Sequence, residues 1–439
     1  MHSSISHREV WRLAWPMILS GLTIPLVGVV DTAVMGRLSG PEYIGAVALG
    51  SLVFSYVFFG LGFLRMGTTG LAAQAFGAGD KQALKLLFIR AAALALSLSV
   101  LLYLLHYPLR EFAFYWLEGS ARVENMGREY FDIRLFGMPA VLLRMVLVGW
   151  FLGVQDSRSP LYLLLLTNVA NIVLDIAFVL GLHWQVAGVA WATVAAEYLG
   201  LLLGLWLWWR SPARSHQPIP RSVLWQWRGF LAMFQLNSNI FIRTLMLISC
   251  LAFFTAQGAK QTEVILAANA LLLNFIMFLA FGMDGLAHAA EALVGKCIGA
   301  GQPRSLREAI RITGLWTLGF AVAYSVTYFV FAHALIDLMT TLDSVRIAAG
   351  DYLPWLMILP LLASAGFWLD GVFIGATWSR DMRNMMAISC GLFLLIWWLT
   401  QGWGNHGLWF ALSAWFILRG ITLGLILPRR LRQSDNPRI

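Results

Sequence analysis

Apolar stretches long enough to cross a lipid bilayer constrain this sequence more than any other feature. The hydrocarbon core of a bilayer is about 30 Å thick, and about 20 predominantly apolar residues in a helix cross it. The 439-residue chain carries twelve such stretches. They lie near residues 10–34, 44–69, 84–106, 128–154, 159–181, 186–209, 230–257, 264–288, 307–332, 349–376, 385–401 and 408–428. The pattern predicts an all-α polytopic membrane protein with twelve transmembrane helices.

The composition agrees with a membrane protein. Hydrophobic residues make up 59% of the chain, charged residues make up 12%, and the mean hydropathy is +0.73. Soluble domains carry about 25% charged residues. The net charge of +9 does not indicate nucleic-acid binding, because the basic residues are spread over short loops. Most of them share a side with the two termini, so the positive-inside rule predicts cytoplasmic termini in a bacterial-type inner membrane.

Enzyme and metal-site motifs are absent from the sequence. The three cysteines, Cys250, Cys297 and Cys390, lie far apart without CxxC spacing, so neither a disulfide framework nor a zinc site is indicated. The eight histidines form no HExxH motif, and no nucleophile motif is present. We therefore expect neither an enzyme nor a cofactor.

The two halves of the chain resemble each other. The segment "AQAFGAGDKQ" (73–82) aligns with "GKCIGAGQPR" (295–304) at an offset of 222 residues. The same offset places Gly153 on Gly375 and Tyr130 on Tyr352. Because each half holds six predicted spans, an even number, both copies enter the membrane in the same direction. The sequence thus predicts two pseudo-symmetric six-helix bundles related by an axis along the membrane normal, as in transporters that rock two bundles around a central cavity.

A hydrophilic break separates the two predicted bundles. Residues 210–228 form the longest polar stretch between spans and contain three prolines. We predict an N-terminal lobe at 1–209, a cytoplasmic linker at 210–228 and a C-terminal lobe at 229–439.

Ionisable residues inside the predicted spans mark candidate functional sites. A charge at the bilayer centre costs about 3 kcal/mol even on the insertion scale, so such residues are functional or paired. Ionisable residues inside the spans that we consider as candidates are Asp31, Arg65, Asp132, Arg134, Arg144, Asp175, Glu197, Arg243, Asp284, Asp370 and Arg419.

One group of polar residues converges in the N-terminal half. Asn168, Asn171 and Asp175 are spaced i, i+3 and i+7 and share one helix face. Asp31 and Thr193 come from spans that reach a similar depth. Together these oxygens suit a proton, because burial near a second carboxylate favours protonation, or a sodium ion, which accepts hard oxygen ligands. The alternative is a set of interhelical hydrogen bonds that holds the spans together.

Other residues carry weaker hypotheses. Pro25 lies six residues before Asp31 and can kink its helix, so protonation of Asp31 could change a bend there. Met35 belongs to a set of methionines and aromatic residues that suit a soft substrate cavity. Asp284 and Asp370 form a possible second site or gate.

Two arginines raise the question of a partner. Arg144 could pair with Glu197, whereas Arg243 lies in the middle of its span and requires a nearby acid. Four residues are near enough to span ends to reach the interface, so no function is assigned to them: Arg65, Asp132, Arg134 and Arg419.

Four segments resemble one transporter family. They are "WPMILSGLTIPLVGVVDTAVMGRLS", "AFGAGD", "NIVLDIAFVLGL" with "VAGVAWATVAAEY", and "DGVFIGAT". Together they resemble the multidrug and toxic compound extrusion transporters, most of all the DinF-like branch. The resemblance implies two six-helix bundles that export lipophilic, often cationic compounds in exchange for protons or sodium. It also implies a coupling site at Asp31, Asn171 and Asp175, with Thr193 beside them.

The resemblance leaves alternatives open. Sodium-linked relatives use acids in spans 7 and 10; Asp370 matches one of them, but span 7 holds Arg243 instead of an acid, so protons are favoured over sodium. A lipid-linked precursor flippase of the same superfamily is the nearest rival, and a channel is disfavoured by the absence of a repeated selectivity filter. We expect lipophilic small molecules and the lipid bilayer as partners, no nucleic acid, and a monomer.

Overall fold

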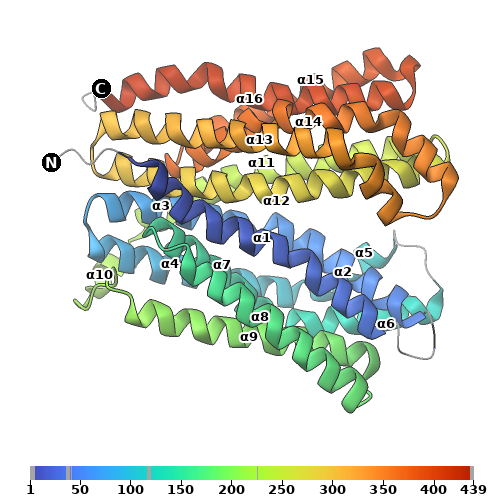
Figure 1. Ribbon diagram of the computed structural model, residues 1–439. Helices are drawn as coiled ribbons and strands as arrows, with labels where there is room; N and C mark the ends of the chain where they lie inside the picture. Colours follow the sequence, from blue (N-terminus) through green and yellow to red (C-terminus); the bar gives the residue numbers. More distant parts are fainter. Residues whose placement is uncertain (1–4, 36–39, 41, 116–119, 225, 436–439) are drawn as a thin grey trace. The chain divides into compact units, whose positions relative to one another are not determined.

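The computed structural model consists of helices joined by short connections (Figure 1). It describes residues 5–35, 40, 42–115, 120–224 and 226–435, without the side chains of 24–27, 29, 30, 32, 56, 57, 221 and 435. No strand occurs among the described residues. The elements are α1 (His7–Met35), α2 (Glu42–Gly60), α3 (Phe63–Gly77), α4 (Lys81–Leu104), α5 (His106–Tyr115), α6 (Ala121–Leu135), α7 (Met138–Gly153), α8 (Arg158–Asp175), η1 (Ile176–Gly181), α9 (Gln185–Arg210), α10 (Arg221–Leu224), α11 (Trp227–Ala259), α12 (Glu263–Gly299), α13 (Pro303–Met339), α14 (Asp343–Gly375), α15 (Ser379–Thr400), η2 (Gln401–Trp403) and α16 (Asn405–Asp435).

The helices confirm the predicted all-α membrane fold. Each of the twelve predicted stretches coincides with one helix or with a consecutive pair. Ten helices of the described chain are long and apolar enough to cross a membrane, and the bent pair α6 and α7 raises the number to eleven. The first predicted stretch coincides with α1, whose 29 residues extend over about 43 Å at 1.5 Å per residue.

Several helices are longer than the apolar stretches predict. Helix α12 continues past the predicted end at residue 288 to Gly299, and so includes the start of "GKCIGAGQPR". The reason is that hydropathy marks only the part of a helix in lipid, while Ala, Glu and Lys sustain helix beyond it. The helix ends where Gly301 adopts a positive φ of 62°, a conformation that favours glycine.

The internal repeat is visible in the backbone. Helices α3 and α12 end at Gly77 and Gly299, and α7 and α14 end at Gly153 and Gly375, each pair separated by 222 residues. Gly79, with a φ of 71°, is likewise the counterpart of Gly301. The two halves therefore share helix boundaries and turn conformations as well as sequence landmarks.

Close helix packing also repeats. A Cβ atom built on Gly149 of α7 would lie 2.5 Å from the carbonyl oxygen of Arg65 in α3. The counterpart Gly371 of α14 approaches the backbone of Ala287 in α12 in the same way. Only glycine permits these approaches, since any larger residue would separate the helices.

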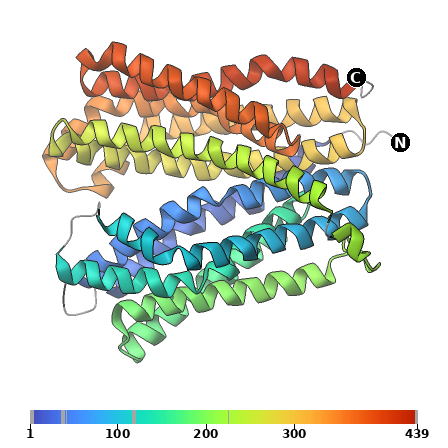
Figure 2. The same ribbon diagram turned by 180° about the vertical axis from the view of Figure 1, so that it is seen from behind.

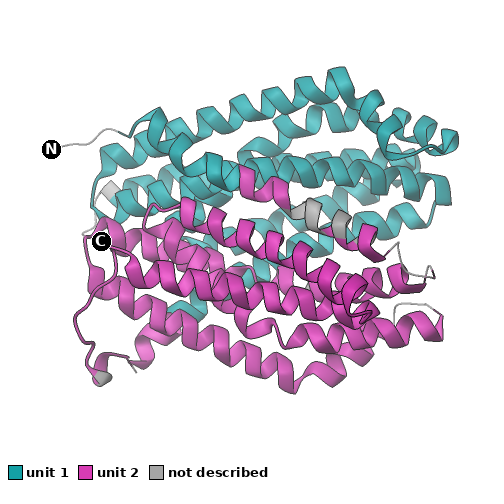
Figure 3. Cartoon of the chain, turned by 60° about the horizontal axis from the view of Figure 1, so that its bottom comes forward, with its two compact units in different colours: residues 1–18, 233–439 teal, residues 19–232 magenta. Residues whose placement is uncertain are grey.

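The chain divides into two compact units (Figure 3). Unit 2 comprises Leu19–Ala232, and unit 1 comprises Met1–Ile18 together with Met233–Ile439. The first residues of α1 thus group with the second half of the chain. The lobe boundaries at 209 and 229 stay predictions.

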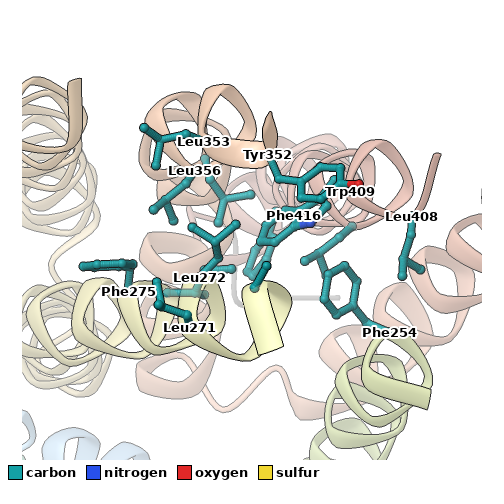
Figure 4. Close-up of a cluster of buried hydrophobic side chains, with 14 of the residues drawn as sticks. Phe254, Leu271, Leu272, Phe275, Tyr352, Leu353, Leu356, Leu408, Trp409 and Phe416 are labelled. Atoms are coloured by element: carbon teal, nitrogen blue, oxygen red, sulfur yellow. The ribbon is translucent and has the colours of Figure 1, made fainter. Parts of the chain in front are cut away.

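Unit 1 is organised around a core of aromatic and aliphatic side chains (Figure 4). Helices α15 and α16 run side by side in this unit (Figure 2). Phe254 of α11, Phe275 of α12, Leu356 of α14 and Trp409 of α16 point into the same cluster. Because each of these four helices contributes a ring or a branched side chain, the cluster fixes their mutual packing.

Candidate functional site

The candidate site lies within unit 2, where α8 packs along α9 (Figure 1). Asn171 and Asp175 are one helical turn apart on α8 and both are buried, with 2% and 0% exposure. The Asn171 Nδ2 group donates to Thr193 Oγ1 of α9 at 3.2 Å. Thr193 in turn donates to the carbonyl oxygen of Val189 at 2.9 Å. The predicted shared face of α8 is therefore real, and Thr193 lies beside it.

Helix α1 supplies the second acid. The carboxyl groups of Asp31 and Asp175 are neighbours and interact electrostatically with each other. A carboxylate only accepts hydrogen bonds, so these two carboxyl groups can bond to each other only when one of them carries a proton. Asn168, the remaining polar residue of the α8 face, donates to Thr23 Oγ1 of α1 at 3.2 Å. Every predicted coupling residue thus contacts another polar residue of α1, α8 or α9.

The site is rich in acceptors and poor in donors. The oxygen atoms Asp31 Oδ1, Asn171 Oδ1 and both carboxyl oxygens of Asp175 are buried, and no donor of another described residue reaches them. Buried polar atoms are nearly always paired, and an unmade hydrogen bond costs about 1–3 kcal/mol. Four such oxygens in one place are expected where a protein takes up a proton or a small cation.

Arg134 is a residue of the site that sequence reasoning missed. Its guanidinium interacts electrostatically with both Asp31 and Asp175, and only 9% of the residue is exposed. It lies 4.2 Å from the ring centre of Phe54. The expectation that Arg134 reaches the membrane interface is therefore wrong. The span is broken between α6 and α7 by a bend of 53°, and Arg134 at the end of α6 faces inward.

A π-helix follows the acid directly. Segment η1 begins at Ile176, the residue after Asp175. The repeat counterpart in unit 1, by contrast, ends in the short 3-10 helix η2. π-Helical turns are rare and occur often at functional sites, and periodicity alone gave no signal for this one.

Two further predicted residues lie on α1. The helix runs through Pro25, but its side chain lies outside the described part of the structure, so the predicted bend stays a hypothesis. Met35 is 1% exposed and packs against Val34, Tyr43 and other core residues of unit 2. In this structure Met35 is a packing residue, and its role in a substrate cavity stays a prediction.

The repeat offers an internal comparison for the acid pair. At the offset of 222 residues, Asp31 corresponds to Phe253 and Asp175 to Trp397. These two rings pack edge to face in unit 1 with centroids 4.9 Å apart. Phe393, the counterpart of Asn171, also packs on Phe253, at 5.8 Å. The same place in the duplicated fold is thus filled by aromatic packing in one unit and by a polar cluster in the other.

The other buried charges form ion pairs. Arg144 and Glu197 are joined at 2.6 Å within unit 2, as predicted. In unit 1, Arg243 finds its acid in Asp370, which also accepts from Arg419 at 2.7 Å.

The cluster in unit 1 is electrically balanced. Asp284 interacts electrostatically with Arg243, so two acids face two arginines. The expectation that Arg419 reaches the membrane interface is wrong, because the residue is 4% exposed and its guanidinium lies 5.1 Å from the Trp415 ring centre. A second site at Asp284 and Asp370 stays a prediction, although the arginines already compensate both carboxylates.

A duplicated all-helical membrane fold with a buried acid pair defines a class of membrane transporters. The family model MatE matches the chain twice, at residues 16–177 and 240–399. The chain belongs to this family, the multidrug and toxic compound extrusion transporters. Members of the family are transporters, not enzymes. The double match also supports the internal repeat.

Named relatives and solved structures agree with this assignment. The chain is 42% identical to DNA damage-inducible protein F of Escherichia coli, over 98% of this chain and 94% of that protein. It is 24% identical to the probable multidrug resistance protein NorM of Chromobacterium violaceum, over 97% and 94%. An outward-facing multidrug resistance MATE family transporter of the MOP superfamily has the same fold, with a TM-score of 0.88 at 19% identity over 99% and 100%. The spans and the bacterial relative support a multi-pass inner-membrane protein.

Proposed function

We propose that this chain is a proton-coupled antiporter that exports lipophilic, often cationic compounds by alternating access, and that Asp31 and Asp175 bind the coupling proton. The observation that carries the proposal is the juxtaposition of the Asp31 and Asp175 carboxyl groups, three of whose oxygen atoms are buried without a donor. Such a pair holds one proton readily, since two neighbouring carboxylates repel each other when both are ionised. Releasing that proton leaves a second negative charge in a buried place.

Arg134 compensates the charge that proton release creates. Its guanidinium interacts with both acids and is held over the Phe54 ring, so it remains near the pair in either protonation state. A cationic substrate would stabilise the deprotonated pair in a similar way. Competition between substrate and proton for the same negative charge is a sufficient physical basis for antiport.

The repeat argues against a purely structural role for the polar cluster. If these residues only held helices together, the aromatic packing of Phe253 and Trp397 in unit 1 would serve equally well at the equivalent place. Asp31 and Asp175 are moreover an unfavourable choice for packing, because they bring two acids together.

Sodium is the second candidate for the coupling ion. The four buried oxygens without donors, two of them on Asp175, form an oxygen-rich site of the kind that binds hard cations. The proton is favoured because two neighbouring carboxylates repel each other when both are ionised, which favours protonation of one of them.

The test is transport by the full-length protein in proteoliposomes, with ethidium as the exported cation and imposed pH or sodium gradients. We expect a pH gradient to drive ethidium transport, ethidium addition to release protons, and Asp31→Asn and Asp175→Asn each to abolish both. Asp343→Asn is the matched control, since the Asp343 side chain is 87% exposed.

Three outcomes would contradict the proposal. Transport that responds only to sodium would assign the site to that ion. Lipid scrambling without ethidium transport would indicate a flippase. Gradient-driven export that survives both Asp→Asn changes would remove the acid pair from the coupling mechanism.

A further inference from the structure

Two cysteines that are distant in the sequence meet inside unit 1. Cys250 of α11 and Cys390 of α15 are separated by 140 residues, and their Sγ atoms are 3.0 Å apart. Both are free thiols, as is the buried Cys297 of α12. Sequence spacing gave no indication of this pair, because the repeat counterparts of the two cysteines are Gly28 and Asn168.

The two thiols are placed for covalent pairing. A disulfide requires an S–S distance of about 2.05 Å, so the sulfur atoms need to approach by about 1 Å. The Cys390 Sγ also lies 3.7 Å from the carbonyl oxygen of Met246, one turn before Cys250 on α11. Side chains join the same helices, since Phe253 of α11 packs on Phe393 of α15. Both sulfurs therefore face the seam between α11 and α15.

Cys390 is the more accessible of the two thiols. The residue is partly exposed, while Cys250 is 4% exposed. Accessibility to the oxidant is one of the conditions for a cysteine to react. Cys390 is therefore the thiol that an oxidant meets first, and Cys250 is positioned to resolve the product.

We propose that Cys250 and Cys390 are a redox modification site, which hydrogen peroxide converts to a disulfide that ties α11 to α15 and slows transport. The Cys390 thiolate attacks one peroxide oxygen and becomes a sulfenic acid, while the other oxygen leaves as water after taking up a proton. The Cys250 sulfur then attacks the sulfenic sulfur and expels a second water. Two thiols and one peroxide thus give one disulfide and two waters.

The effect on transport rests on the proposed function. Helix α11 occupies in unit 1 the place that α1 occupies in unit 2, as the pairing of Phe253 with Asp31 shows. Alternating access proceeds by rocking or gating of one bundle against the other, and a gating movement of a helix requires freedom at the seams with its neighbours. A covalent bond beside the Arg243–Asp370–Arg419 cluster restrains α11 relative to α15.

The test uses the full-length protein in proteoliposomes, treated with hydrogen peroxide and then with a reductant. Thiols are counted with a maleimide after denaturation, and disulfide-linked peptides are identified by mass spectrometry. We expect two of the three thiols to be lost, Cys250 and Cys390 to be joined, and the ethidium transport rate to fall in step with thiol loss and recover on reduction. Cys297→Ala should behave like the wild type, whereas Cys250→Ala and Cys390→Ala should keep their transport rate after peroxide.

The two halves of the proposal can fail separately. A count of three free thiols after peroxide treatment would overturn the modification site, whatever the protein transports. Oxygen adducts on the cysteines without a disulfide-linked peptide would overturn it as well. A linked peptide that forms without any change in ethidium transport would overturn the effect on transport and leave the antiport proposal intact.

Discussion

The glycines at the helix crossings make the packing of the duplicated fold testable. In Gly149→Ala, the new Cβ atom would lie 2.5 Å from the Arg65 carbonyl oxygen and 3.0 Å from the Thr68 Cβ atom. Carbon atoms prefer separations of about 3.5–4.0 Å, so α7 must move away from α3 by up to about 1 Å. The obstacle is backbone, which cannot rotate aside as a flexible side chain could.

The magnitude follows from comparison with an unobstructed glycine. Overpacking of this kind costs about 1–3 kcal/mol, and the gain in helix propensity from Gly to Ala is about 1 kcal/mol. A Cβ atom on Gly319 of α13 meets nothing within 4 Å, so Gly319→Ala gains the propensity without the clash. The two variants should differ in unfolding free energy by about 2 kcal/mol, with Gly149→Ala the less stable.

The assay is thermal or denaturant unfolding in detergent, followed by the fluorescence of the 20 tryptophans. The repeat adds a second measurement, because Gly371→Ala places its Cβ atom 2.9 Å from the Ala287 Cα atom and should be destabilised to a similar extent. Equal stability of Gly149→Ala and Gly319→Ala would refute the close-approach reasoning.

Two further predictions concern polar groups in each unit. In unit 1, Asn269 and Asn405 exchange amide hydrogen bonds of 2.8 and 2.9 Å, and the Trp409 indole donates to Asn269 at 2.9 Å. The change Asn269→Leu leaves the Asn405 amide and the Trp409 indole without these partners, at a cost of about 1–3 kcal/mol for each group. We therefore expect the free energy of unfolding in detergent to fall by at least about 2 kcal/mol. In unit 2, Arg128 and Arg110 donate to Glu111 and hold its pKa below the ordinary value of 4.5. A carboxyl group whose pKa is lowered by folding stabilises the folded protein. For Glu111 this stabilisation is complete above pH 4.5 and is lost as the pH falls through the lowered pKa. The unfolding temperature of Glu111→Gln should therefore depend less on acid pH than that of the wild type. An identical acid profile for the two proteins would contradict the role of the pair.

Much of the fold could be predicted because bilayer thickness imposes a length on every apolar stretch. The repeat was predictable as well, since Gly77 and Gly299 end equivalent helices and such turns tolerate few residues. The ends of helices beyond the bilayer were not predictable, because polar residues such as those that continue α12 to Gly299 occur in helices and in loops alike.

The site was predictable where spacing along one helix decides geometry. Asn171 and Asp175 share a face because they are one turn apart, whatever surrounds them. Arg134 escaped prediction because its direction depends on the bend between α6 and α7, a tertiary feature. The thiol pair escaped for the same reason, since nothing local relates Cys250 to Cys390.

The duplication also bears on why only one unit carries the acid pair. Two copies of one helical arrangement begin with the same packing requirements, and in unit 1 Phe253, Phe393 and Trp397 meet them with aromatic contacts. The polar cluster of unit 2 lacks these aromatic contacts, and the acceptor oxygens of Asp31, Asn171 and Asp175 have no donors. Both features lower the stability of the folded unit. A local arrangement that is less stable than its own duplicate is expected at sites that work on a ligand. In unit 1 the carboxylate of Asp370 is instead held by Arg243 and Arg419, which already supply its compensating charge. If the acid pair is the coupling site, ion binding at this place of the duplicated fold is therefore a property of unit 2, and the aromatic counterpart keeps unit 1 from taking up a second ion at the equivalent place.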